Sequence, residues 1–204
     1  VYWCPHCETA LAEAEIEYND DKSFSIYVKF KSVDVSGHMP KDADPEKVFA
    51  LIWTTTPWTI PCNLAISANE NLEYVWVRVG DEYLLMAKER VDVTMQAGKV
   101  TDYEVLPDVM TGKQLEGMVF MHPFYGRKVP VILGDHVTLE AGTGLVHTAP
   151  DHGQDDFDVC MKYEAWGLKP LGTVDGSGRY TDKVPGFEGQ FVFDANVQVI
   201  KKLA

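Results

Sequence analysis

Four threonine hydroxyls are concentrated in one short segment of this sequence, at Thr54, Thr55, Thr56 and Thr59. Pro57 lies among them, so the apolar run before it cannot continue as a regular strand ladder. Hydroxyls donate and accept hydrogen bonds, as does the amide of Asn63, and such groups suit sugar hydroxyls, carbonyl groups or a water molecule. Threonine is also common in strands and asparagine in turns, so composition alone favours a structural role. A second proline at position 61 shifts the balance towards a shaped binding loop.

A second segment combines glycines, a histidine and acids, with the letters GTGLVHTAP at 142–150 and HGQDD at 152–156. His147 lies near the end of a short apolar strand, and a polar loop leads from it to the start of a predicted helix. Asp155 and Asp156 fall at that start, where the helix dipole favours the ionised carboxylate. We expect one of the two acids to cap the helix and the other to point into a cleft, where it can bind an ammonium group.

The same segment could instead hold a metal ion, through His147 and His152 with Asp151, Asp155 and Asp156. The spacing matches no helical histidine pair such as H-E-x-x-H, so this hypothesis is the weaker one. A single histidine in a strand is more often packed and hydrogen-bonded than a metal ligand. No Gly-x-Ser-x-Gly elbow is present and no cysteine stands beside a candidate base, which argues against a covalent nucleophile.

Cys4 and Cys7 have the C-x-x-C spacing that forms half of a zinc knuckle. A second pair is absent, because Cys62 and Cys160 each stand alone. A redox pair and two plain thiols are the alternatives to a zinc half-site. If zinc is bound, its other ligands are expected elsewhere in a longer chain. Four cysteines without a secretory signal predict a reducing compartment, the cytoplasm.

The elements that must position these side chains are mostly strands. Apolar alternation and short apolar runs predict strands over 24–30, 49–53, 74–79, 83–87, 128–133 and 144–148. Helices are predicted over 88–96, 155–166 and 194–203, the last capped by Asp194. This pattern predicts an α+β fold with a barrel-like or strongly curved sheet and peripheral helices. The irregular stretches 32–46 and 170–190 are expected to be surface insertions, so we predict a single domain over 1–204.

The charge balance excludes one mode of binding. The 204 residues include 31 acidic and 18 basic ones, a net charge of −13, so a broad face cannot hold a nucleic acid by charge alone. No apolar run approaches the roughly 20 residues that span a bilayer, so we expect no membrane partner. The sequence opens without Met, which predicts a segment cut from a longer chain.

Together, the two central segments resemble the editing domain inserted into the catalytic fold of isoleucyl-tRNA synthetases. The letters WTTTPWT at 53–59 resemble that family's threonine-rich peptide, and 142–156 resemble its second editing motif. Related valyl and leucyl enzymes usually carry Thr-Arg-Pro where this chain has Thr-Thr-Pro, and usually lack a histidine at position 147. Cys62 departs from the small residues that are commoner there in the family.

The resemblance implies hydrolysis of valine from tRNA(Ile), and of valyl-adenylate, by water attack on an activated acyl carbon. Asp156 would pair with the α-ammonium of the substrate, and His147 would close the end of the pocket that receives the side chain. With Thr56, these two would form the catalytic group. The substrate would also be bound by Thr54, Thr55, Trp58, Thr59, Asn63 and Asp155. Positioning and desolvation would supply much of the rate without a strong general base.

The resemblance also implies partners and cofactors. The partners would be the 3′ end of tRNA(Ile), the misactivated valine and the remainder of the same synthetase chain, in a monomer. No cofactor is expected for editing; zinc could bind in the full chain, and ATP only in the catalytic domain outside this segment. The alternative function is a non-catalytic insertion that binds tRNA or a partner and carries half of a zinc knuckle.

Overall fold

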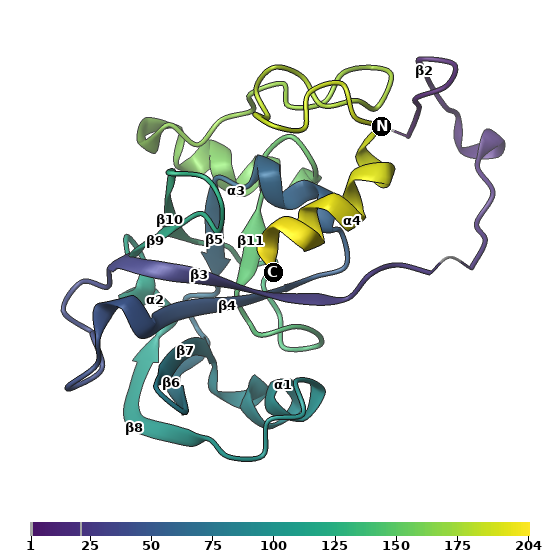
Figure 1. Ribbon diagram of the computed structural model, residues 1–204. Coiled ribbons are helices and arrows are strands. Elements are labelled where there is room, and N and C mark those ends of the chain that lie inside the picture. The colour runs from purple at the N-terminus through teal and green to yellow at the C-terminus, as the bar shows by residue number, and fades with distance from the viewer. Residues whose placement is uncertain (1, 21) are drawn as a thin grey trace.

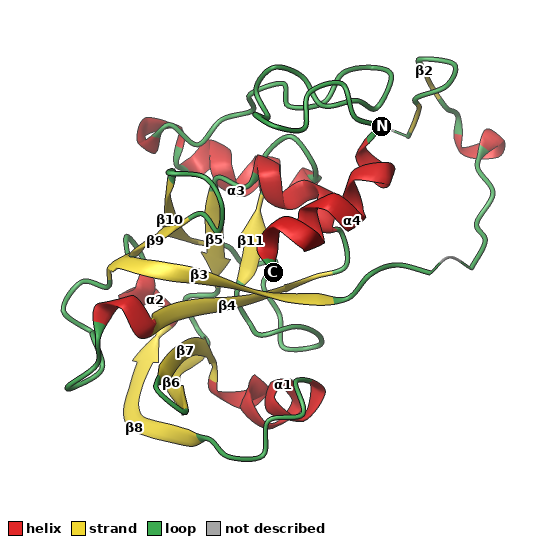
Figure 2. Ribbon diagram, in the orientation of Figure 1, coloured by secondary structure: helices red, strands yellow, loops and turns green. Residues whose placement is uncertain are grey.

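The computed structural model describes residues 2–20 and 22–204, and within them nine strands form one mixed sheet (Figures 1 and 2). These strands are β3 (Ile26–Asp34), β4 (Val48–Thr54), β5 (Ala65–Ala68), β6 (Glu73–Val79), β7 (Glu82–Ala87), β8 (Glu104–Thr111), β9 (Val119–Met121), β10 (Lys128–Leu133) and β11 (Val146–Thr148). A separate hairpin pairs β1 (Trp3–Cys4) with β2 (Thr9–Ala10). The helices are α1 (Val91–Ala97), α2 (Gly112–Leu115), α3 (Gln154–Lys162) and α4 (Val192–Leu203).

The strand order is β11-β5-β10-β9-β3-β4-β7-β6-β8. The pairs β5–β10 and β4–β7 are parallel, and the other neighbours are antiparallel. The long strands β3 and β4 cross the middle of the molecule, with β6, β7, β8 and α1 on one side and β5, β10, β11 and α3 on the other (Figure 1). The long central strands therefore connect two groups of shorter ones.

The sheet curls back on itself just before β11. The Thr143 hydroxyl donates to the carbonyl of Leu51 at 2.6 Å, and the Ala87 amide donates to the carbonyl of Thr143 at 2.8 Å. Gly144 has a φ of +76°, and a Cβ placed on it would lie 2.3 Å from the Cβ of Ala87. Only glycine fits that approach. The edge strands β8 and β11 do not pair in the described part of the chain, so the sheet is strongly curved rather than a closed barrel. The predicted α+β class is confirmed.

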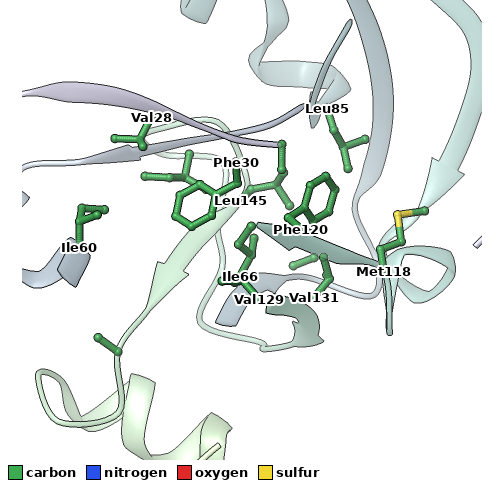
Figure 3. Close-up of a cluster of buried hydrophobic side chains, with 14 of the residues drawn as sticks. Val28, Phe30, Ile60, Ile66, Leu85, Met118, Phe120, Val129, Val131 and Leu145 are labelled. Atoms are coloured by element: carbon green, nitrogen blue, oxygen red, sulfur yellow. The ribbon is translucent and has the colours of Figure 1, made fainter. Parts of the chain in front are cut away.

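Both faces of β4 are largely buried, which explains its nearly continuous apolar sequence, whereas β3 alternates between buried and exposed residues along much of its length. Along β4, Ala50 and Ile52 enter the main core, and Leu51 points to the opposite face. Figure 3 shows the main core, in which Phe30 of β3, Phe120 of β9 and Leu145, just before β11, converge. Successive side chains of a strand alternate between faces, so each face needs its own cover.

Three helices supply much of that cover. Val91 and Met95 of α1 pack on the cluster that contains Leu51, and Val159 and Cys160 of α3 pack on Ile132. The apolar side of α4 joins the main core beside the 3₁₀ turn Pro57–Cys62. None of the described helices is long and apolar enough to cross a bilayer.

Some predicted element boundaries were wrong. The first long strand continues to Asp34, into the stretch predicted to be irregular, and β11 starts only at Val146 because the glycines before it adopt positive φ. α3 ends at Lys162 and a 3₁₀ turn follows it. Asp194 does not cap α4, which begins two residues earlier, at Val192. Gly153 occupies the N-cap of α3, and no side chain caps that helix, so neither predicted acidic cap forms.

Candidate functional site

A cavity of about 360 Å³ is lined by the end of β4, the segment 136–145, β11 and the first turn of α3. That volume lies within the range of small-molecule sites in proteins. The sheet curvature brings these elements together, because the segment before β11 is bonded to both β4 and β7. Both segments singled out by their chemistry border the cavity, through Thr54, Thr55, Thr56, Thr59, His147, His152 and Asp156.

The threonine hydroxyls form a connected row along one wall. Thr54 Oγ1 lies 3.2 Å from Thr56 Oγ1, which lies 3.3 Å from Thr59 Oγ1. Thr54 Oγ1 also accepts the backbone N–H of Thr56 at 3.1 Å. The strand ladder ends at Thr54 and the chain turns into the 3₁₀ segment at Pro57, as the position of the proline predicts. Thr56 is exposed, so its hydroxyl is available to a ligand.

His147 is held by both ring nitrogens. Nε2 lies 2.7 Å from Thr59 Oγ1, and Nδ1 lies 3.2 Å from Asn63 Nδ2. Asn63 Nδ2 also donates to the carbonyl of Ala65 at 2.8 Å, which fixes the orientation of the amide. His147 Nδ1 must therefore accept, and the proton resides on Nε2. Thr59 can accept that proton, because its own hydroxyl donates to the carbonyl of Thr56 at 2.8 Å.

The environment of His147 keeps the ring neutral. Burial, with a smaller contribution from the nearby His152 ring, lowers its pKa to about 4. A neutral ring with one donor and one acceptor matches the two partners that it has. Because Nε2 carries a proton and Nδ1 is occupied by Asn63, neither nitrogen offers a free lone pair to a reactant. His147 therefore lines the cavity as a ring whose two nitrogens are both held by protein groups.

Asp156 lies in the first turn of α3 and faces the cavity. Its pKa is raised to about 6, mainly by desolvation; the backbone N–H of Ala149 opposes this shift and Asp155 adds to it. No lysine or arginine within residues 2–20 and 22–204 forms an ion pair with it. A Cβ on Gly153 would lie 2.5 Å from Asp156 Oδ2, so the glycine leaves room for the carboxylate. The cavity thus contains a partly desolvated acid without a cation.

The remaining candidate residues lie outside the cavity lining. Asp155 is exposed and does not line it. Asn63 is buried behind His147, and its contact with that ring is its link to the cavity. Trp58 packs edge-on against His152, with ring centroids 4.9 Å apart, and against Phe193. Trp58 therefore supports a residue of the wall.

Comparison with known proteins shows the family to which the chain belongs. A family model described as the leucyl-tRNA synthetase editing domain matches residues 92–179. An isoleucine–tRNA ligase of Thermoanaerobacter sp. (strain X514) is 51% identical over 203 residues, 99% of this chain and 21% of that protein. The chain belongs to the family of isoleucyl-tRNA synthetase editing domains. It spans about a fifth of the length of the curated relatives it matches.

Solved structures agree with this editing-domain fold. The crystal structure of GlLeuRS-CP1 is similar with a TM-score of 0.68 at 17% identity, over 88% of this chain and 95% of that chain. The P. knowlesi cytosolic leucyl-tRNA synthetase editing domain is similar with a TM-score of 0.63 at 10% identity, over 87% of this chain and 91% of that chain. At such identities the similarity establishes the fold alone.

Several residues that line the cavity of this editing domain were not predicted from sequence. They are His136 and Thr138 in the segment after β10, with Trp53 at the end of β4. Arg90 holds the same segment by donating to the carbonyls of Gly142 at 2.8 Å and Leu139 at 3.0 Å. An isolated histidine and threonine in a loop carry no distinctive spacing, so the sequence offered no signal for them.

Cys4 and Cys7 lie away from the cavity, in the β1–β2 hairpin. The Cys7 backbone N–H lies 3.4 Å from Cys4 Sγ and lowers the pKa of that thiol. The described residues contain no group of three or more His, Cys, Asp or Glu side chains placed to hold a metal. The pair alone supplies two of the four ligands of a structural zinc site, so the described residues do not complete one.

We predict that His147 stays a neutral Nε2–H tautomer from pH 5 to pH 8. Its pKa of about 4 lies below the ordinary value of 6.5, so the unfolded chain binds more protons between these values. The stabilising contribution of this residue is complete above pH 6.5 and is lost as the pH falls towards 4. Long-range ¹H–¹⁵N spectra measure the tautomer directly, with His147→Gln to assign the signals. A titration midpoint near 6.5, or a proton on Nδ1, would contradict the assignment.

Proposed function

We propose that this editing domain hydrolyses valine from valyl-tRNA(Ile), and also hydrolyses valyl-adenylate. The proposal rests on the carboxylate of Asp156, which lies in the cavity without a cationic partner in the described part of the chain. Removing a carboxylate from water is costly unless a counter-charge is supplied. The α-ammonium of an aminoacyl group supplies that charge and gives a short, directional bond. Both substrates carry such a group.

Selection of valine would depend on the His147 wall. One methylene is worth only about 1–3 kcal/mol of discrimination, a limit for which isoleucyl-tRNA synthetases are the standard example. A second pocket that excludes the larger side chain overcomes this limit. His147 suits the role because Thr59 and Asn63 hold both of its nitrogens, so the ring cannot rotate away. Close packing against a rigid wall rejects an extra methylene.

The reaction we propose is attack of water on the acyl carbon. Asp156 orients the substrate through its ammonium group. The exposed hydroxyl of Thr56 holds the acyl carbonyl, the terminal ribose or the water, with Thr54, Thr55 and Thr59 beside it. The ester is already activated, so placing the water in line with its carbon supplies much of the acceleration.

The partners we propose follow from the charge of this domain. With a net charge of −13, it receives only the flexible 3′ end of tRNA(Ile), and the rest of the synthetase holds the tRNA body. We propose that it acts as part of a monomeric cytoplasmic enzyme, where thiols stay reduced. Editing would use no cofactor, ATP would serve only the catalytic domain, and Cys4 with Cys7 would contribute half of a zinc site completed elsewhere in the full chain.

We predict that Asp156→Asn lowers the rate of valyl-tRNA(Ile) deacylation by about 30-fold or more. Losing the charged partner of a buried ion pair costs about 2 kcal/mol or more. Asp155→Asn is the matched control, because that acid is adjacent but exposed, and its rate is expected to stay near the parental one. Deacylation in the absence of ATP measures both. A parental rate in the Asp156 variant would contradict the proposed role and favour the non-catalytic alternative.

The pH dependence of the parent supplies an independent check on Asp156. A pKa of about 6 means that most of the carboxyl is ionised at pH 7 and most is protonated at pH 5. Only the ionised form pairs with ammonium, so kcat/KM is expected to fall as the pH is lowered through 6. The Asp156→Asn variant is expected to lack that inflection.

We predict that His147→Ala begins to hydrolyse correctly charged isoleucyl-tRNA(Ile), which the parent spares. Removing the ring removes the steric penalty, which is about 1–3 kcal/mol, or one to two powers of ten in selectivity. Hydrolysis of valyl-tRNA(Ile) is expected to continue, at a lower rate. The measurement is the ratio of the two deacylation rates in parent and variant, and an unchanged ratio would refute the steric role.

A further inference from the structure

His152 is fixed in the wall of the cavity by one ring nitrogen only. Its Nε2 lies 2.9 Å from the hydroxyl oxygen of Thr173, and its ring packs edge-on against Trp58. Nδ1 has no hydrogen-bond partner among residues 2–20 and 22–204. His147 differs in this respect, because protein groups occupy both of its nitrogens.

The protonation of His152 follows from the partners of Thr173. The Thr173 hydroxyl donates its proton to Asp151 Oδ2 at 2.6 Å, so towards His152 it can only accept. Asp151 is itself fixed by the backbone N–H groups of Leu171 at 3.0 Å and Thr173 at 3.1 Å. His152 Nε2 therefore carries the proton, and Nδ1 carries a lone pair. The chain Asp151–Thr173–His152 sets the tautomer of the ring.

We propose that His152 is the general base of the editing reaction, accepting the proton of the attacking water on Nδ1. This inference rests on the proposed function, because it names the proton acceptor for the same hydrolysis. Asp151 and Thr173 are positioning residues that act through the ring and do not touch the substrate.

Every bond and proton in the proposed step is accounted for. The water oxygen bonds to the acyl carbon while one water proton moves to His152 Nδ1, giving a tetrahedral oxyanion and an imidazolium. The oxyanion collapses, the bond from the acyl carbon to the ribose oxygen breaks, and the Nδ1 proton passes to that oxygen. The products are the tRNA 3′ terminus with its hydroxyl restored and valine, whose carboxyl group releases its proton to solvent.

The charges around His152 suit this role. Burial lowers the pKa of His152 below its ordinary value, and Asp151 opposes that shift. His147 and Asp156 also border the cavity, and Cys62 contacts Thr173. The ring is consequently neutral at pH 7, with its lone pair available, and Asp151 stabilises the imidazolium formed during the step.

The test is single-turnover deacylation of valyl-tRNA(Ile) by the full-length synthetase that carries this chain, without ATP, from pH 5 to pH 9. His152→Gln and His152→Ala are expected to lower the plateau rate by about 10²- to 10⁴-fold. Their remaining rate is expected to rise tenfold per pH unit, because hydroxide replaces the base. Added imidazole is expected to rescue His152→Ala partially and the parent not at all. Thr173→Val is expected to lower kcat with KM unchanged.

Binding of a non-hydrolysable valyl-adenosine amide separates chemistry from folding and binding. We expect the His152 variants to bind it within about threefold of the parent, whereas Asp156→Asn loses affinity. His38→Gln, a histidine outside the cavity, is the matched control and is expected to keep the parental rate. A parental rate and pH profile in the His152 variants, or an equal loss of affinity and rate, would overturn the inference. An inactive parent would overturn the proposed function and this inference with it.

Discussion

The close contact between the segment before β11 and the neighbouring strands β4 and β7 is the constraint on which the shape of the site depends. Thr143 bonds to both strands, and Gly144 lies so close to Ala87 that no side chain fits between them. This contact curls the sheet, and the pairing of β11 with β5 places His147 beside Thr59, about ninety positions earlier in the chain. The threonine row, the histidine wall and the first turn of α3 share a cavity as a consequence of that crossing.

Within this frame, His147 is neutral and has both ring nitrogens hydrogen-bonded. Buried polar atoms without a partner also remain, among them Asn63 Oδ1 and the Nε2 of His136, which lines the cavity. We assign chemistry to two other groups. Thr59 and Asn63 complete the hydrogen bonds of His147, which leaves it suited only to shape the cavity. Asp156 lacks a cation, and His152 has one free nitrogen. A buried polar group without a partner is costly, so such groups indicate where a ligand supplies the missing interaction. In our proposal, Asp156 binds the substrate and His152 transfers the proton.

Much of the strand pattern could be predicted from sequence, because alternation and turn residues are local signals. The hairpin of β6 and β7, the end of β4 before Pro57 and the existence of α1, α3 and α4 all follow from such signals. The short strands β1, β2 and β9 were missed, and so were β5 and β8: the four buried residues of β5 have no alternation, and β8 contains a proline and an aspartate. Trp58 and Asn63 were expected in the pocket, yet they lie behind His152 and His147. Which layer a side chain occupies depends on tertiary packing, which no local pattern encodes.

The central claim is that the unpaired carboxylate of Asp156 receives the α-ammonium group of a misattached valine. A crystal structure of this domain with a non-hydrolysable valyl-adenosine amide tests it most directly. The account predicts the ammonium nitrogen within hydrogen-bonding distance of Asp156, the valine side chain against the His147 ring, and that ring still bonded to Thr59 and Asn63. An ammonium group that points to solvent, or a ligand bound outside the cavity, would contradict it.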